Sequence, residues 1–197
     1  MQSEVILLNK NILLCGVGGQ GIVLTSKLTA SAAMEKGYSV MSAETIGMAQ
    51  KGGSVFSFLR FGDEIYTPMF GLHQADMLIA FEPAEAVRML SYLKPDGCVI
   101  VNSKPVMPVT AVLKKASYQG AEMLDYLKKH VQNLTIIDGE KACHAIGSPK
   151  VLNMIMLGAA VKSGVLPFSI QDAENAMIKS VKPQFIELNQ KALHYEI

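Results

Sequence analysis

A glycine-rich loop near the N-terminus has the spacing of an anion-binding site. Residues 16–21 (GVGGQG) match the pattern G-x-G-x-x-G, follow an apolar run and precede a segment with helical periodicity. Glycine at these places permits a tight turn, a close approach of the backbone to a pyrophosphate, and close packing of helix on strand. A helix N-terminus adds free N–H groups and a favourable dipole. We therefore predict an anion site formed by Gly16, Gly18, Gly19, Gln20 and Gly21. The alternative is that the glycines serve only the packing of the strand-to-helix turn.

A second glycine-rich turn follows the second predicted strand. Lys51, Gly52, Gly53 and Ser54 combine a positive charge with main-chain N–H groups, which suits a phosphate or a carboxylate. The same four residues also suit a turn that starts a strand. Glu44, at the end of the preceding strand, is a candidate for binding the ribose hydroxyls of NAD. A solvated strand end or a helix cap explains Glu44 equally well. We expect both loops to lie at one edge of the sheet.

The cysteines and histidines form no recognisable catalytic or metal-binding pattern. The three cysteines are far apart in the sequence, which excludes zinc spacing and an iron–sulfur ligand run. No residue is predicted to be catalytic, and no metal site is predicted. The expected roles are structural for His73 and His144, solvated for His130 and His194, and the capping of a neighbouring loop for Asn153, with a ligand contact as its alternative.

Hydrophobic periodicity predicts the elements that position the two loops. Continuous apolar runs bounded by glycine or polar residues are typical of strands buried on both faces, whereas apolar residues on one face at a 3.6-residue period indicate helices. The predicted strands are 11–15, 38–43, 54–61, 75–81, 98–102 and 134–138. The predicted helices are 20–37, 83–93, 150–162 and 170–193, with breaks at Pro167 and Pro183.

Alternation of strands and helices predicts the fold class. Residues 54–61 alternate strongly, and the turn at 62–64 leads to a short apolar segment at 65–67, which predicts a β-hairpin. We expect an α/β fold with a three-layer Rossmann-like sheet, mostly parallel with an added β-hairpin, and a helical C-terminus. Residues 1–197 are expected to form a single domain, on which C-terminal helices at about 168–197 pack.

The composition excludes several classes of protein. Of the 197 residues, 50% are hydrophobic and 18% are charged, which is sufficient for a buried core. The formal net charge is +1, and no block of like charges is available to follow nucleic acid or an anionic membrane. The apolar stretch at the N-terminus is interrupted by polar residues at 9–11, which argues against a membrane helix or a signal peptide. We expect a cytoplasmic protein with neither nucleic acid nor a membrane as partner.

Two long motifs in order resemble a known family. GVGGQGI (16–22) and AETIGMAQKGGSVFS (43–57) resemble the gamma-type subunit or domain of 2-oxoacid:ferredoxin oxidoreductases, and within that group the beta subunit of indolepyruvate oxidoreductase. The similarity continues through ADMLIAFEPAEAVR (75–88) and GSPKVLNMIMLGA (147–159). The resemblance therefore covers most of the chain.

This resemblance implies a function that the chain performs only in a complex. The family oxidatively decarboxylates a 2-oxoacid, here an aryl-2-oxoacid such as indolepyruvate, with coenzyme A to give acyl-CoA, CO2 and reduced ferredoxin. The resemblance assigns thiamine diphosphate and the iron–sulfur clusters to a large partner subunit, which passes electrons to ferredoxin. It implies that this chain binds no cofactor tightly, is inactive alone and has coenzyme A as a candidate ligand.

One position departs from the family pattern, and several alternatives stay open. The family commonly has Gln-Arg-Gly-Gly where this chain has a lysine at Lys51. Lysine keeps the charge but loses the bidentate geometry of arginine, which puts the role of this position in doubt. The alternatives are a gamma subunit for pyruvate, 2-oxoglutarate or branched-chain oxoacids, a self-contained NAD-binding Rossmann protein, and a scaffold without a ligand. A homodimer of the isolated chain is also expected, because a surface made for a partner exposes apolar area.

Overall fold

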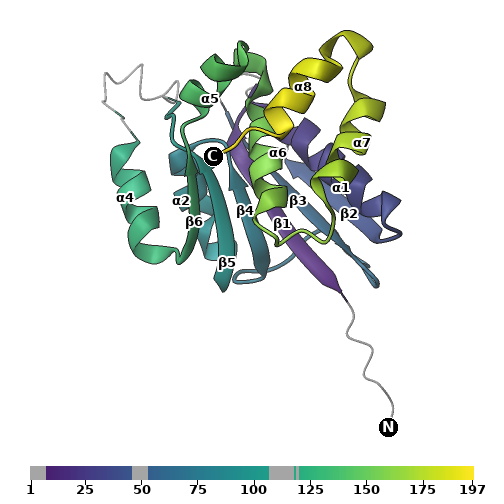
Figure 1. Cartoon of the computed structure of the whole chain (residues 1–197). Helices are drawn as coiled ribbons and strands as arrows, with labels where there is room; N and C mark the ends of the chain where they lie inside the picture. Colours follow the sequence, from purple (N-terminus) through teal and green to yellow (C-terminus); the bar gives the residue numbers. More distant parts are fainter. Residues whose placement is uncertain (1–7, 46–52, 107–117, 119) are drawn as a thin grey trace.

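A six-stranded sheet with the order β2-β3-β1-β4-β5-β6 forms the middle layer of the protein (Figure 1). The computed structural model describes residues 8–45, 53–106, 118 and 120–197. β1 pairs in parallel with β4, β4 with β5 and β5 with β6, whereas β3 is antiparallel to both β1 and β2. The strands are β1 (Asn9–Val17), β2 (Ser39–Thr45), β3 (Ser54–Gly62), β4 (Ala75–Ala80), β5 (Leu93–Asn102) and β6 (Asn133–Ile137).

Helices cover both faces of this sheet, which confirms the predicted α/β architecture (Figure 1). One face packs against α1 (Ile22–Glu35), α6 (Leu152–Lys162), α7 (Ile170–Ser180) and α8 (Ile186–Leu193). The other face packs against α2 (Pro83–Met89) and α4 (Ala121–His130). α5 (Gly139–Ile146) follows β6, and single 3-10 turns lie at Leu90–Tyr92, Pro149–Val151 and Pro183–Phe185.

The central strands are apolar on both faces, as expected for a sheet covered by two helical layers. Along β1, Ile12 and Leu14 belong to the cluster under α1 and α6, while Leu13 and Cys15 belong to the cluster under α2 and α4. All four side chains are fully buried. This two-sided burial explains why the sequence shows a continuous apolar run there.

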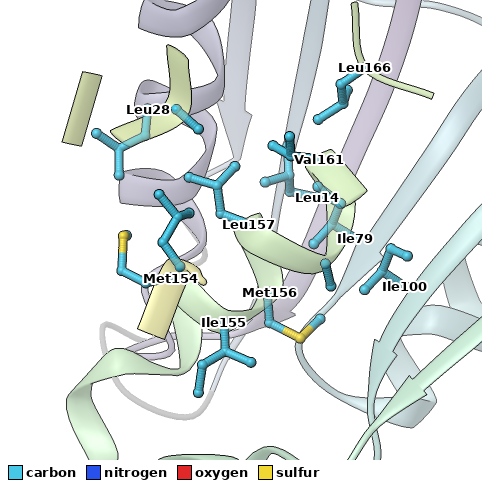
Figure 2. Close-up of a cluster of buried hydrophobic side chains, with 14 of the residues drawn as sticks. Leu14, Leu28, Ile79, Ile100, Met154, Ile155, Met156, Leu157, Val161 and Leu166 are labelled. Carbon is cyan, nitrogen blue, oxygen red and sulfur yellow. The ribbon is translucent and has the colours of Figure 1, made fainter. Parts of the chain in front are cut away.

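α6 is the most deeply buried helix of the first face. Nine of its eleven residues are buried, and Figure 2 shows its Met154, Ile155, Met156 and Leu157 among side chains from β1, β4 and β5. This predicted helix therefore packs in the core of the protein. No helix in the described ranges is long and apolar enough to cross a membrane.

The sheet contains an antiparallel strand, β3, as predicted. The prediction that residues 65–67 form the second strand of a hairpin is wrong. Residues 65–67 are not a strand, and β3 pairs with β2 and β1 instead. Because both edges of β3 are occupied, no edge is open for a further strand. The segment is held by Arg60, whose Nη1 donates to the carbonyl of Thr67 at 3.1 Å, and by burial of Ile65.

Two helices, α4 and α5, lie in segments for which we predicted no element. α5 is short, but its boundaries carry recognisable signals. The side chain of Asp138 accepts a hydrogen bond of 2.9 Å from the N–H of Lys141, and Gly147 ends the helix with φ of 91°. An Asp cap followed by a glycine stop would have identified α5. The predicted helix 170–193 is divided into α7 and α8, as the break at Pro183 predicts.

Candidate functional site

The glycine loop connects β1 to α1 at the carboxyl edge of the sheet. Gly19 and Gly21 have φ of 99° and 87°, in the left-handed region that favours glycine. Gly16 is required for a different reason, because a Cβ there would lie 2.7 Å from Gln20 Oε1 and 2.7 Å from Phe81 Cβ. β1 and β4 adjoin here, and the chain leaves them toward opposite sides of the sheet. This is the switch point at which α/β proteins bind ligands.

Gln20 fixes the loop with both ends of its side-chain amide. Its Oε1 accepts a hydrogen bond of 2.7 Å from the N–H of Val17, and its Nε2 donates to the carbonyl of Phe81 at 3.0 Å. That carbonyl also accepts a hydrogen bond of 3.1 Å from Asn102 Nδ2. The side chain of Gln20 therefore positions the loop, and the predicted ligand role of this residue stays a prediction.

Some N–H groups of the loop donate to main-chain carbonyls, and two in the first turn of α1 have no acceptor among the described residues. The N–H of Gly18 donates to the carbonyl of Gly53 at 2.9 Å, and the N–H of Gln20 donates to Val17 at 3.2 Å. α1 begins without a side-chain cap and without an acidic residue in its first turn. Among the described residues, no acceptor is present for the N–H groups of Ile22 and Val23. The helix N-terminus therefore retains donors for an anion.

Asn153, on α6, packs against the glycine loop at Gly21. A Cβ on Gly21 would lie 2.9 Å from the Cβ of Asn153, so the two backbones approach closely. Asn153 is 6% exposed and its carbonyl is 3.5 Å from Thr25 Oγ1. Asn153 therefore lies against the glycine loop, and the predicted capping of a neighbouring loop by its side chain stays a prediction.

The second predicted turn is described only at Gly53 and Ser54, and Lys51 and Gly52 lie outside the described residues. The Gly53 carbonyl binds the glycine loop, so the two predicted loops do converge. The hydroxyl of Ser54 donates to Glu85 Oε2 at 2.6 Å. Ser54 is therefore engaged with α2.

Two buried carboxylates lie at the start of α2, and our sequence analysis did not single them out. Glu82 is 2% exposed; its Oε2 caps α2 by accepting from the N–H of Glu85 at 3.0 Å. Its Oε1 accepts from the hydroxyl of Tyr118 at 2.6 Å and from the N–H of Val106 at 3.3 Å. Burial and the hydrogen bond to Glu82 raise the pKa of Tyr118. Burial, followed by the charge of Glu85, raises the pKa of Cys15, which keeps that thiol protonated.

The position of Glu44 argues against a dinucleotide site of the dehydrogenase type. In that fold the acidic residue follows a strand that adjoins the strand before the glycine loop. Here β3 lies between β1 and β2, so Glu44 is two strands from the loop. With strands about 4.8 Å apart, this separation is about 10 Å.

A cavity of about 470 Å³ opens at the same edge, beside α5. Lys104 and Glu140 form an ion pair of 2.9 Å among the lining residues. Burial raises the pKa of Cys143, an effect that the positive charge of Lys104 partly offsets, so the thiol is a neutral part of the wall. The lining residues are Asn102, Lys104, Gly139, Glu140, Cys143, His144, Gly147, Ser148, Pro149 and Leu152.

The other histidines lie away from this edge or in structural contacts. The main-chain N–H of His73 donates to the carbonyl of Ser91 at 3.0 Å, and the structural role predicted for its side chain stays a prediction. The ring of His130 stacks on Tyr126 with centroids 4.0 Å apart. His194 is exposed, as predicted, and its Nε2 also lies 2.7 Å from Glu174 Oε2 in a hydrogen-bonded pair.

Comparison with known proteins identifies the family. A model described as pyruvate ferredoxin/flavodoxin oxidoreductase matches residues 11–195. The chain belongs to this family. Indolepyruvate oxidoreductase subunit IorB of Pyrococcus horikoshii is 35% identical over 184 residues, which cover 92% of this chain and 91% of that protein. The subunit of the same name from Archaeoglobus fulgidus is 36% identical over 184 residues, which cover 93% of this chain and 91% of that protein.

A solved structure agrees with this assignment. The gamma subunit of the keto/oxoacid ferredoxin oxidoreductase from Geobacter sulfurreducens PCA superimposes with a TM-score of 0.71 at 26% identity, covering 94% of this chain and 93% of that chain. The predicted resemblance and fold class are thereby confirmed. As a member of the pyruvate ferredoxin/flavodoxin oxidoreductase family, the chain is a subunit of a 2-oxoacid oxidoreductase complex.

The cysteines of this family member do not fit an iron–sulfur cluster. Cys15, Cys98 and Cys143 are buried on β1, β5 and α5 respectively. A cluster requires several thiolates converging on one point. Within the described ranges, no three metal-ligating side chains come together.

Proposed function

We propose that this chain is the cluster-free subunit of an enzyme that oxidises an aryl-2-oxoacid, indolepyruvate, with coenzyme A. In the balanced reaction the bond between the carboxylate and the oxo carbon breaks and CO2 leaves. The acyl group replaces the proton on the CoA sulfur, that proton is released, and the two electrons pass to ferredoxin. The names of the relatives at 35% and 36% identity support the substrate. The large partner subunit supplies thiamine diphosphate and the iron–sulfur clusters, and this chain is inactive without it.

The single observation that carries the role of this chain is the uncapped N-terminus of α1 at the glycine loop. Its open N–H groups and the helix dipole suit the phosphates of coenzyme A. The absence of an acidic side chain from the first turn of α1 avoids repulsion of those phosphates. Gln20 and Gly53 fix the loop before any ligand arrives, since both bind its main chain.

The contribution of this chain is binding rather than chemistry. The side chains of Gln20 and Ser54 are engaged inside the protein, and burial raises the pKa of the Cys15 thiol and keeps it protonated. Main-chain donors hold an anion without accepting or releasing a proton. Because this chain supplies main-chain donors for binding and none of its side chains is predicted to be catalytic, we expect no turnover by the chain alone.

Substitution of Gly18 in the assembled complex tests the role of the loop. Gly18→Asp places a negative charge at the anion site, whereas Gly18→Asn adds nearly the same volume without charge. We expect the aspartate to raise KM for coenzyme A at least tenfold beyond the asparagine, with kcat and subunit assembly retained. Equal KM values for the two variants would contradict the proposal.

A further inference from the structure

We propose that the cavity beside α5 receives the base of an ADP-containing ligand whose phosphates lie at the glycine loop. This inference rests on the anion site of the proposed function and extends it to a second subsite. The cavity is formed by the end of β5, one face of α5 and the start of α6.

The size and walls of the cavity suit a planar ring. Its volume of about 470 Å³ falls within the range of small-molecule sites, about 300–1,000 Å³. Leu152, Pro149 and the neutral thiol of Cys143 provide apolar surface, and Gly147 leaves the main chain accessible, since no atom lies within 4 Å of a Cβ placed there. A Cβ on Gly139 would lie 2.5 Å from Leu152 Cδ1, so a larger side chain there would disturb the wall.

The cavity and the glycine loop are adjacent parts of one edge. Leu152 lines the cavity, and the next residue, Asn153, packs against Gly21 of the loop. A chain of hydrogen bonds also connects them, from Gln20 through the Phe81 carbonyl to Asn102. β1 and β5 are separated only by β4, so the strand ends that carry the loop and border the cavity are about 10 Å apart, a distance within the length of a nucleotide.

The rim of the cavity carries a cation that can reach an anionic ligand. Lys104 lies at the cavity with its side chain 53% exposed, and its partner Glu140 is 70% exposed. An exposed pair of this kind is weak, so the ammonium group can turn toward a phosphate at little cost. The main chain below it is fixed, because Asn102 Oδ1 accepts from the N–H groups of Gly139 at 3.2 Å and Lys104 at 3.4 Å.

ADP is common to coenzyme A and NAD, so the chemistry of the subsite alone does not choose between them. Titration calorimetry of the full chain with ADP, inorganic pyrophosphate, coenzyme A and NADH separates these sources. We expect ADP to bind more tightly than pyrophosphate, and coenzyme A more tightly than NADH, because Glu44 is displaced from the loop.

Filling the cavity provides the decisive variant. His144→Trp enlarges an exposed lining residue, and Ala145→Trp is the matched control on an exposed, non-lining position of the same helix. We expect His144→Trp to weaken ADP binding at least tenfold and to leave pyrophosphate binding unchanged. The control should change neither.

The outcomes distinguish this inference from the proposed function. If ADP binds His144→Trp as tightly as the wild type, or no more tightly than pyrophosphate, the cavity is not the base subsite, although the anion site stands if Gly18→Asp abolishes pyrophosphate binding. If neither ADP nor pyrophosphate binds, both proposals are wrong. NADH bound in preference to coenzyme A would keep the subsite and overturn the proposed cosubstrate.

Discussion

The Ser54 hydroxyl lies 2.6 Å from Glu85 Oε2, which joins the first residue of β3 to the buried start of α2. Glu85 is 6% exposed, so its carboxylate depends on donors from the protein. The preceding residue, Gly53, accepts the hydrogen bond from Gly18. The contact between Ser54 and Glu85 therefore helps to hold Gly53 in place, and Gly53 in turn holds the glycine loop.

Removal of the Ser54 hydroxyl should destabilise the fold. Ser54→Ala leaves a buried carboxylate oxygen without this donor, at a cost of about 1.5–3 kcal/mol in the free energy of unfolding. Urea denaturation measures the loss, with Ser42→Ala on the exposed side of β2 as control, expected within about 0.5 kcal/mol of the wild type. Equal effects for the two variants would show that the Ser54–Glu85 contact contributes nothing.

Gly16→Ala should disturb the link between the loop and β4. The added Cβ would meet Gln20 Oε1 and Phe81 Cβ, both at 2.7 Å, and overpacking of this kind costs about 1–3 kcal/mol. Gly71→Ala is the control, because its nearest neighbour would be 3.6 Å away. Urea denaturation measures the free energy of unfolding of both variants. A loss for Gly16→Ala no larger than that for Gly71→Ala would contradict the structure.

Gly158→Ala should loosen α8 from α6. A Cβ at Gly158 would collide with the carbonyl oxygen of Leu193 at the end of α8. We expect a loss of about 1–3 kcal/mol in unfolding free energy and faster tryptic cleavage after Lys191. Wild-type cleavage kinetics would mean that α8 does not depend on this close approach.

Acidification should weaken the attachment of the C-terminus. Hydrogen bonds from His194 and Gln190 lower the pKa of Glu174 below its ordinary value. A carboxyl with a depressed pKa in the folded state contributes stability above its unfolded pKa, about 4.3, and that stability is lost as pH falls through the folded pKa. His194→Ala should reduce the fall in Tm between pH 5 and pH 3, measured by calorimetry. An identical fall in variant and wild type would exclude this contribution.

The sequence predicts most of the sheet because its central strands are buried on both faces. Residues 12–15 and 98–101 are apolar without interruption, and both lie in central strands. Residues 65–67 have similar local character but no free strand edge to pair with, since β1 and β2 occupy both sides of β3. Pairing of distant strands is a tertiary property, and no local pattern reports it.

The candidate site is predictable in position but not in the roles of its side chains. The glycine spacing locates the turn from β1 to α1, and the burial of Asn153 is expected from its place on an apolar helix. The roles of Gln20 and Ser54 depend on Phe81 and Glu85, which are distant in sequence and adjoin only in the folded sheet. The buried pair of Glu82 and Glu85 was missed for the same reason.

Reconstitution with the large subunit tests the central claim most directly. The measurement is the coenzyme A-dependent reduction of ferredoxin by indolepyruvate, with the large subunit in the presence and absence of this chain. We predict activity only when both are present and none with either alone. Full activity of the large subunit without this chain would contradict its assignment as a required subunit.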